Sequence, residues 1–136
     1  MKDIAIKEHH LYNKAYKKGK SYVGRLVVVY VLRDYGAERI MKANPSKTYV
    51  NRLGLSVSKK LGGAVVRNRV KRILRAGYDT VKDELKVGNL IVLSARGAAV
   101  KRKSTDVARE LGRAFASLDM FDGKDSAKGD IPTKEI

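Results

Sequence analysis

The pattern of apolar and polar positions predicts three helices and three strands. Apolar residues at helical spacing predict helices over residues 7–18, 64–85 and 106–118, and β-branched runs or alternation predict strands over 23–32, 49–58 and 90–95. The run "LVVVYVL" at 26–32 is apolar on both faces, so its strand should be central or covered on both sides. The order α–β–β–α–β–α predicts an α+β sandwich, with helices packed on a small mixed sheet.

Two parts of the chain differ in composition. At 136 residues the chain has the length of one domain. Residues 119–136 contain five acids, are rich in Gly, Ser and Pro, and show no apolar periodicity. We therefore expect a folded domain over 1–118 and a flexible acidic tail over 119–136.

The net charge of +16 is informative about the binding partner rather than about the fold. An excess of this size indicates a polyanionic partner, nucleic acid first and an anionic membrane surface second. The longest apolar run has seven residues, whereas a membrane-spanning helix needs about 20. No secretory signal is visible in residues 1–20, and the absence of cysteine excludes disulfides. These features predict a cytoplasmic protein without membrane contact.

The stretch "SKKLGGAVVRNRVKRILR", residues 58–75, carries much of this charge and no acid. On a helical wheel the apolar positions of 64–85 fall within an arc of about 120°, which holds Val66, Val70, Ile73, Leu74, Gly77, Val81 and Leu85. The rest of the circumference carries Arg67, Arg69, Lys71, Arg72 and Arg75. One stripe can therefore bury against a sheet while the other face presents cations.

A basic helix face that is merely exposed to solvent would normally contain Glu between its basic residues, because like charges at i,i+4 destabilise a helix by a few tenths of a kcal/mol per pair. Reading of the DNA major groove usually needs a helix-turn-helix or a paired basic region, and neither is visible here. Arginine matches phosphate oxygens bidentately and stacks on bases. The pattern therefore favours RNA, recognised through phosphates, 2′-hydroxyls and unpaired bases.

At "RLGLSVSKKLGGAVVRNRVKRILR", residues 52–75, the sequence closely resembles the bacterial ribonuclease P protein subunit. That family has a strand ending in a Ser-x-Ser-Lys-Lys run, then a Gly and an Ala-Val, and then Arg-Asn-Arg leading into Lys-Arg. The resemblance extends over residues 7–118 through two aromatics before "KKGKS", the strand "RLVVVYVL", and "LIVLSARG". Two departures are Gly63, where many members have Asn, and tyrosines at positions 12 and 16, where many have Phe.

The resemblance implies a left-handed β-α-β crossover in which the Arg-Asn-Arg helix is the crossing element. It also implies a ribonucleoprotein enzyme that cuts the 5′ leader from precursor tRNA, with the chemistry carried by the RNA subunit and its bound Mg²⁺. The expected partners are the catalytic RNA and precursor tRNA. No obligate protein partner and no tightly bound metal on the protein are expected.

Two binding surfaces follow from the resemblance. The surface for the catalytic RNA comprises Lys59, Lys60, Arg67, Asn68, Arg69, Lys71, Arg72 and Arg75. The surface for the single-stranded leader, in a cleft between the first helix and the sheet, comprises Tyr12, Tyr16, Lys17, Lys18, Arg25, Val28, Tyr30 and Ser56. Rings that stack on unpaired bases contribute about 1–3 kcal/mol per base, and ordinary core packing is the alternative role for each ring.

No catalytic centre is expected on the protein itself. His9 and His10 are adjacent, so their rings diverge, and Asp79 and Asp83 lie on a helix face that also carries lysines. Two other functions stay open from the residues alone: a structural RNA-binding protein of ribosomal type, and a basic protein associated with DNA. An aromatic surface for a single strand is the feature that a scaffold protein would not need.

Overall fold

The computed structural model describes residues 4–6, 9–34, 51–86 and 88–121. Its strands are β1 (Ile4–Ala5), β2 (Lys20–Val23), β3 (Val27–Arg33), β4 (Arg52–Ser56) and β5 (Asn89–Ala95). Its α-helices are α1 (His9–Lys18), α3 (Ala64–Asp79) and α4 (Ser104–Ser117), with 3₁₀ turns η1 (Lys59–Leu61), η2 (Lys82–Glu84) and η3 (Gly97–Lys101). The expectations for residues 7–8, 49–50 and the tail beyond 121 lie outside the described residues.

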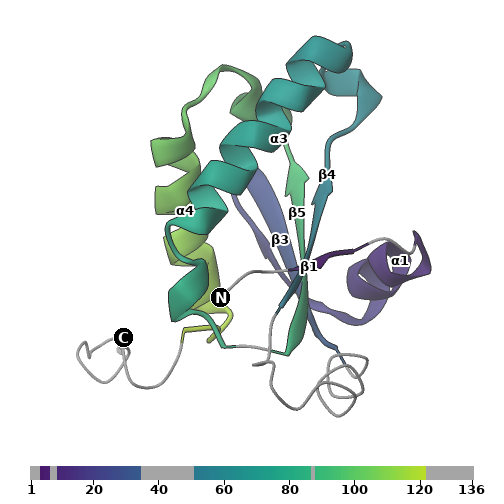
Figure 1. Ribbon diagram of the computed structural model, residues 1–136, viewed down its shortest axis with the longest axis vertical. Helices are drawn as coiled ribbons and strands as arrows, with labels where there is room; N and C mark the ends of the chain where they lie inside the picture. Colours follow the sequence, from purple (N-terminus) through teal and green to yellow (C-terminus); the bar gives the residue numbers. More distant parts are fainter. Residues whose placement is uncertain (1–3, 7–8, 35–50, 87, 122–136) are drawn as a thin grey trace.

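The strands form one mixed sheet in the order β1-β4-β5-β3-β2, which confirms the predicted α+β class. The pairs β1–β4 and β4–β5 are parallel, and β5–β3 and β3–β2 are antiparallel. Figure 1 shows α3 and α4 on one side of the sheet and α1 on the other. The strand β3 lies between β5 and β2, as its two apolar faces predict.

The connection from β4 to β5 passes through α3. Because β4 and β5 are parallel neighbours, this connection is a β-α-β crossover with the arginine-bearing helix as its crossing element. The left hand implied by the resemblance stays a prediction.

Two predicted elements differ from the structure at their ends. The strand predicted over 23–32 is a hairpin of β2 and β3 with its turn at 24–26, and the helix predicted over 64–85 ends at Asp79. The Thr80 hydroxyl donates to the Gly77 carbonyl at 2.7 Å, and a 3₁₀ turn follows. Leu85 is still buried, at 3% exposure, because it packs in the hydrophobic core, and the neighbouring Lys86 N–H is bonded to the Met120 carbonyl at 2.7 Å.

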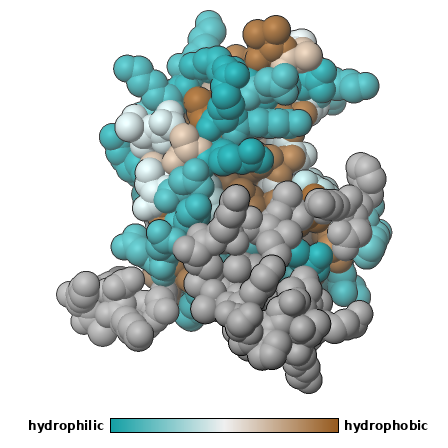
Figure 2. All heavy atoms as spheres, viewed as in Figure 1, coloured by the Kyte–Doolittle hydropathy of each residue, from teal (hydrophilic) through white to brown (hydrophobic). Residues whose placement is uncertain are grey.

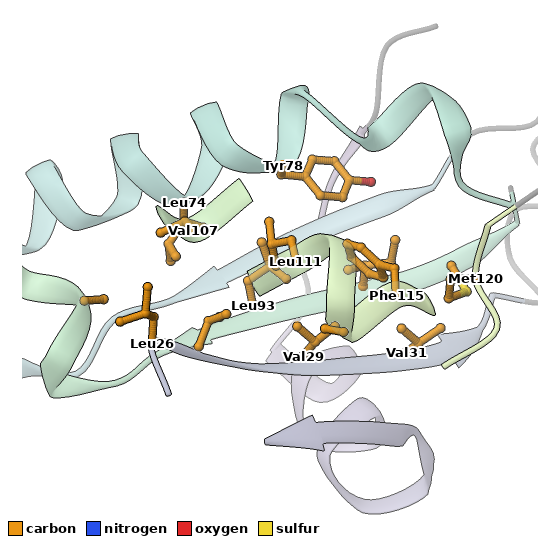
Figure 3. Close-up of a cluster of buried hydrophobic side chains, with 14 of the residues drawn as sticks. Leu26, Val29, Val31, Leu74, Tyr78, Leu93, Val107, Leu111, Phe115 and Met120 are labelled. Carbon is orange, nitrogen blue, oxygen red and sulfur yellow. The ribbon is translucent and has the colours of Figure 1, made fainter. Parts of the chain in front are cut away.

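Hydrophobic side chains pack on both faces of the sheet. The larger cluster fills the space between the sheet, α3 and α4, and Figure 3 shows Leu74, Val107, Leu111 and Phe115 converging on the strands. The helices approach closely at Gly77, where an added Cβ would lie 2.8 Å from Val107 Cγ1. The smaller cluster lies under α1 and contains Ile6, Leu11, Ala15, Leu90 and Val92. Each face of the sheet therefore anchors a different helical layer.

The larger cluster continues into the segment that the sequence assigns to the acidic tail. Met120 is 4% exposed and belongs to this core, and Phe121 packs against it and bridges to Leu85. The folded part of the chain therefore extends at least to Phe121. The remainder of the predicted tail lies outside the described residues.

A buried carboxylate holds the turn between β2 and β3. Glu110 on α4 is 3% exposed and accepts the backbone N–H groups of Arg25 at 2.9 Å and of Leu26 and Val27 at 2.8 Å each. Gly24 makes room for it, because a Cβ there would lie 2.6 Å from the carboxylate. Three charge-assisted hydrogen bonds thus satisfy a buried charge and fix the hairpin to α4.

We predict that Glu110→Gln lowers the free energy of unfolding by about 1–3 kcal/mol, because the amide NH₂ must face an N–H donor. Glu84→Gln is the matched control: Glu84 is exposed on η2, and its change should stay within about 0.5 kcal/mol. Denaturant unfolding of both variants measures the difference. Equal stability of the two variants would show that the carboxylate does not hold the turn.

Candidate nucleic-acid interface

The first candidate surface is the arginine ridge, defined as the cations on the outer face of α3: Arg67, Arg69, Lys71, Arg72 and Arg75. The opposite stripe of α3 buries Val70, Leu74 and Gly77 against the core, as the helical wheel predicts, and it also buries Tyr78, which was not predicted. Arg67 is half-buried and the other four are exposed. Figure 2 shows hydrophilic side chains along the front of this helix. Burial of the apolar stripe thus orients the cations outward.

The ridge cations have no acidic partner among the residues that the structure describes. Ion pairs among those residues include Arg52 with Asp34, Lys82 with Asp79, Lys86 with Asp119 and Arg109 with Asp106, and none of these involves the ridge. The Nε atom of Arg67 is buried and has no hydrogen-bond partner. The ridge therefore presents positive charge that the described part of the molecule does not neutralise.

Arg69 differs from the rest of the ridge. Its guanidinium donates to the carbonyl of Val100 at 2.6 Å and to that of Arg102 at 3.3 Å. These carbonyls lie at the end of η3 and just after it, ahead of α4. Arg69 therefore ties α3 to this connection, a structural role that the sequence pattern did not indicate.

Lys59 and Lys60 lie on η1, immediately ahead of α3, and both are exposed. The Ser58 hydroxyl accepts the Lys60 N–H at 3.1 Å and holds this turn. Gly62 follows with φ +147°, a conformation that a side chain would strain. Asn68 is exposed on α3. All eight residues predicted to bind the catalytic RNA thus lie on the continuous segment from η1 through α3.

The second candidate surface is the tyrosine surface, defined by Tyr12, Tyr16 and Tyr30 with the sheet residues Val28 and Ser56. The rings of Tyr16 and Tyr30 pack edge to face, with centroids 4.8 Å apart and an interplanar angle of 70°. Tyr16 stays 37% exposed. An exposed ring supported by a second ring suits stacking on a base.

Tyr12 is held more firmly than Tyr16. Its ring lies over Gly54, where an added Cβ would be 2.7 Å from Cε1. Burial raises the pKa of the Tyr12 hydroxyl above its ordinary value of 10.0, nearby Tyr16 raises the pKa further, and a hydrogen bond with the Leu55 backbone acts in the opposite direction. Tyr12 therefore packs on the strand and is half-buried, and its stacking on a base stays a prediction.

The sheet contributes a row of small side chains beside the rings. Ser56 pairs in register with Ser94, Ser94 with Val28, and Val28 with Val23. Val23 is 67% exposed, and the other three are half-buried. Ser94 and Val23 were missed by the sequence reasoning, because only strand register brings them beside Val28.

The predicted cations of the leader surface lie around these residues. Lys17 and Lys18 are exposed in the last turn of α1, and Arg25 is exposed in the turn that Glu110 holds. The two candidate surfaces lie on opposite faces of the sheet but approach at the end of β4. Ser56 belongs to the tyrosine surface, and Lys59 begins the segment that leads into the arginine ridge.

Within the described ranges, no three His, Asp or Glu side chains gather in a way that could hold a metal ion. No helix in these ranges is long and apolar enough to span a bilayer.

Comparisons with known proteins agree with this architecture. The family model for ribonuclease P matches residues 1–119. The ribonuclease P protein component of Clostridium acetobutylicum is 36% identical over 126 residues, covering 91% of this chain and 98% of that protein. The component from Listeria welshimeri is 34% identical over 110 residues, covering 81% and 83%.

Solved structures give the same result. The RNase P protein of Staphylococcus aureus superposes with a TM-score of 0.70 at 30% identity, over 89% of this chain and all of that one. The Thermotoga maritima RNase P protein superposes with a TM-score of 0.62 at 22% identity, over 83% and 94%, a likeness of fold.

The fold and these matches define a class first: bacterial protein components of a ribonucleoprotein nuclease that processes tRNA. Within that class, the chain belongs to the ribonuclease P protein family. The resemblance seen in residues 7–118 is thereby confirmed. The roles predicted for individual residues stay predictions.

The environment of Tyr12 predicts a pH dependence. Because the folded-state pKa is raised, the hydroxyl stays protonated in the folded chain after it ionises in the unfolded chain. Stability from this group is complete below pH 10 and is lost as pH rises through the folded-state pKa. Wild-type protein should therefore lose more stability above pH 10 than Tyr12→Phe does, as measured by denaturant unfolding at stepped pH.

Tyr22→Phe is the control for this prediction, since it removes a half-buried tyrosine hydroxyl and leaves Tyr12 in place. This variant should lose as much stability above pH 10 as the wild-type protein does. A Tyr12→Phe variant whose stability falls with pH as steeply as that of the wild type would contradict the account.

Proposed function

We propose that this chain binds the RNA subunit of ribonuclease P through the arginine ridge and η1, and holds the 5′ leader of precursor tRNA on the tyrosine surface. It thereby assists the endonucleolytic maturation of the tRNA 5′ end in the cytoplasm. The observation that carries the proposal is the placement of two chemically different surfaces on opposite faces of one sheet, meeting at the end of β4.

The ridge suits a folded RNA. Guanidinium groups bind phosphate oxygens bidentately, and cations without an acidic partner give up no ion pair when they bind. A-form RNA closes its major groove to side chains, so a ridge of this kind would contact phosphates and 2′-hydroxyls.

The tyrosine surface suits an unpaired strand. Exposed rings stack on bases without strict sequence demands, and the lysines at the end of α1 supply charge for the backbone. Tyr16 is the ring best placed for this role, because Tyr30 supports it and its exposure is the largest of the three.

The proposal assigns positioning to the protein and bond cleavage to the RNA. Mg²⁺ would be held mainly by the RNA subunit and would supply the activation of water there. The residues of this chain would anchor the RNA and restrict the leader to one path. The competing function, a structural RNA-binding protein, needs the ridge alone.

The test compares leader removal from precursor tRNA with catalytic RNA alone, with protein alone, and with both. We expect the protein to accelerate cleavage only in the presence of the RNA. Tyr16→Ala should weaken binding of precursor tRNA by about 1–3 kcal/mol, or roughly 5- to 150-fold, with little effect on assembly with the catalytic RNA.

Arg72→Ala should do the reverse: it should weaken assembly and lower the salt slope of that binding by about 0.7–0.9. Arg72 is preferred to Arg69 because Arg69 also binds the carbonyls near η3. Arg113→Ala, on the exposed face of α4, controls for charge. Acceleration without the RNA, or equal effects of Tyr16→Ala and Arg72→Ala on both binding steps, would contradict the proposal.

A further inference from the structure

A groove of about 350 Å³ lies at the end of the sheet opposite the start of α3. It is formed where β3 ends, β5 begins and the chain leaves α4. The apolar part of its lining consists of Val31, Leu32, Leu118 and Met120. Figure 3 shows Val31 and Met120 side by side there. This volume falls within the range of small-ligand sites, about 300–1,000 Å³.

Four cations line the same groove: Lys18, Lys20, Arg33 and Lys86. All four are exposed, so their charged ends are accessible to solvent. The acid in the lining is Asp119, which is 89% exposed and lies 3.4 Å from the Lys86 ammonium. Because an exposed pair of this kind contributes little, Lys86 can exchange that carboxylate for another anion.

The backbone around Asp119 forms one side of the groove. Asp119 has φ +56°, and the N–H of Met120 returns to the Phe115 carbonyl at 2.8 Å, which turns the chain at the end of α4. The Met120 carbonyl then accepts the Lys86 N–H at 2.7 Å. These bonds place the buried Met120 beside Val31, and they bring Lys86 next to Met120 in the lining of the groove.

An apolar lining within a cationic rim matches the chemistry of a nucleotide in a single strand, whose base has an apolar face and whose phosphates are anionic. The groove also lies near the tyrosine surface. Leu32 is four residues beyond Val28 on β3, about 13 Å along the strand, and Lys20 is paired in register with Val31. Lys18, at the end of α1, lines the groove and is also one of the cations predicted for the leader surface.

We propose that this groove binds nucleotides of the leader that lie further from the cleavage site than those on the tyrosine surface. This inference rests on the proposed function, because the groove would continue the path of the same leader RNA. It adds Lys20 and Lys86, which sequence reasoning did not select, as phosphate-binding residues. An acidic protein segment would use the lysines but would not require the leader.

The experiment measures binding of precursor tRNAs to the assembled holoenzyme as the leader is lengthened one nucleotide at a time. With wild-type protein, affinity should rise in two stages, first as the tyrosine surface fills and then as the groove fills. Lys20→Ala and Lys86→Ala should remove the second stage and leave the first unchanged. With the longest leader, each variant should lower the salt slope by about 0.7.

Arg113→Ala, outside the groove on α4, is the matched control and should keep both stages. Asp119→Asn keeps a residue that tolerates positive φ and removes the carboxylate, so it should strengthen the second stage. The proposal is overturned if affinity stops rising once the first stage is complete, or if the lysine variants weaken every precursor equally, whatever its leader. Loss of the first stage in the wild type would instead contradict the proposed function.

Discussion

The architecture depends on the burial of one stripe of α3 against the sheet and α4. The arginine ridge contains four like-charged pairs at i,i+3 or i,i+4 (67/71, 71/75, 69/72 and 72/75), which together cost about 1–2 kcal/mol. Burial of Val70 and Leu74 alone stabilises by about 1.5–3 kcal/mol per side chain. Burial therefore outweighs repulsion, and the helix can carry unneutralised charge on its outer face.

The sheet separates two surfaces of different chemistry. On one face, α3 presents guanidinium groups that suit a folded RNA. On the other, α1 and the strands present tyrosines and small side chains that suit an unpaired strand. The two meet at the end of β4, where Ser56 is followed within three residues by Lys59. A short strand thus links the arginine ridge with the tyrosine surface, which we propose bind the enzyme's RNA and its substrate.

Local patterns predicted much of this arrangement. The apolar stripe of α3, the two apolar faces of β3 and the strand β5 depend on neighbouring residues, so periodicity is enough to find them. The β2–β3 hairpin was missed, although Gly24 and Arg25 interrupt the apolar run at 23–32 where the turn lies. An isolated Gly in a strand pattern is also compatible with a bulge, and the contact that holds this turn comes from Glu110, more than eighty residues away.

The residues of the candidate site also divide into those that local sequence predicts and those that only tertiary structure reveals. The ridge and the tyrosine pair were identified from spacing and resemblance, whereas the packing of Tyr12 on Gly54 and the bonds of Arg69 near η3 depend on tertiary contacts. The row of Ser94 and Val23 beside Val28 needs strand register, and the groove at the end of β3 needs the turn that follows α4. Residues from distant parts of the chain carry no local signal of this kind.

The most direct test of the central claim is the reactivity of individual arginines toward a dicarbonyl reagent, read by mass spectrometry with and without the catalytic RNA. Arg72 and Arg75 should react in the free protein and become protected when the RNA binds, while Arg113 on α4 should react equally in both states. Ridge arginines that react as readily in the complex as in the free protein would contradict the account.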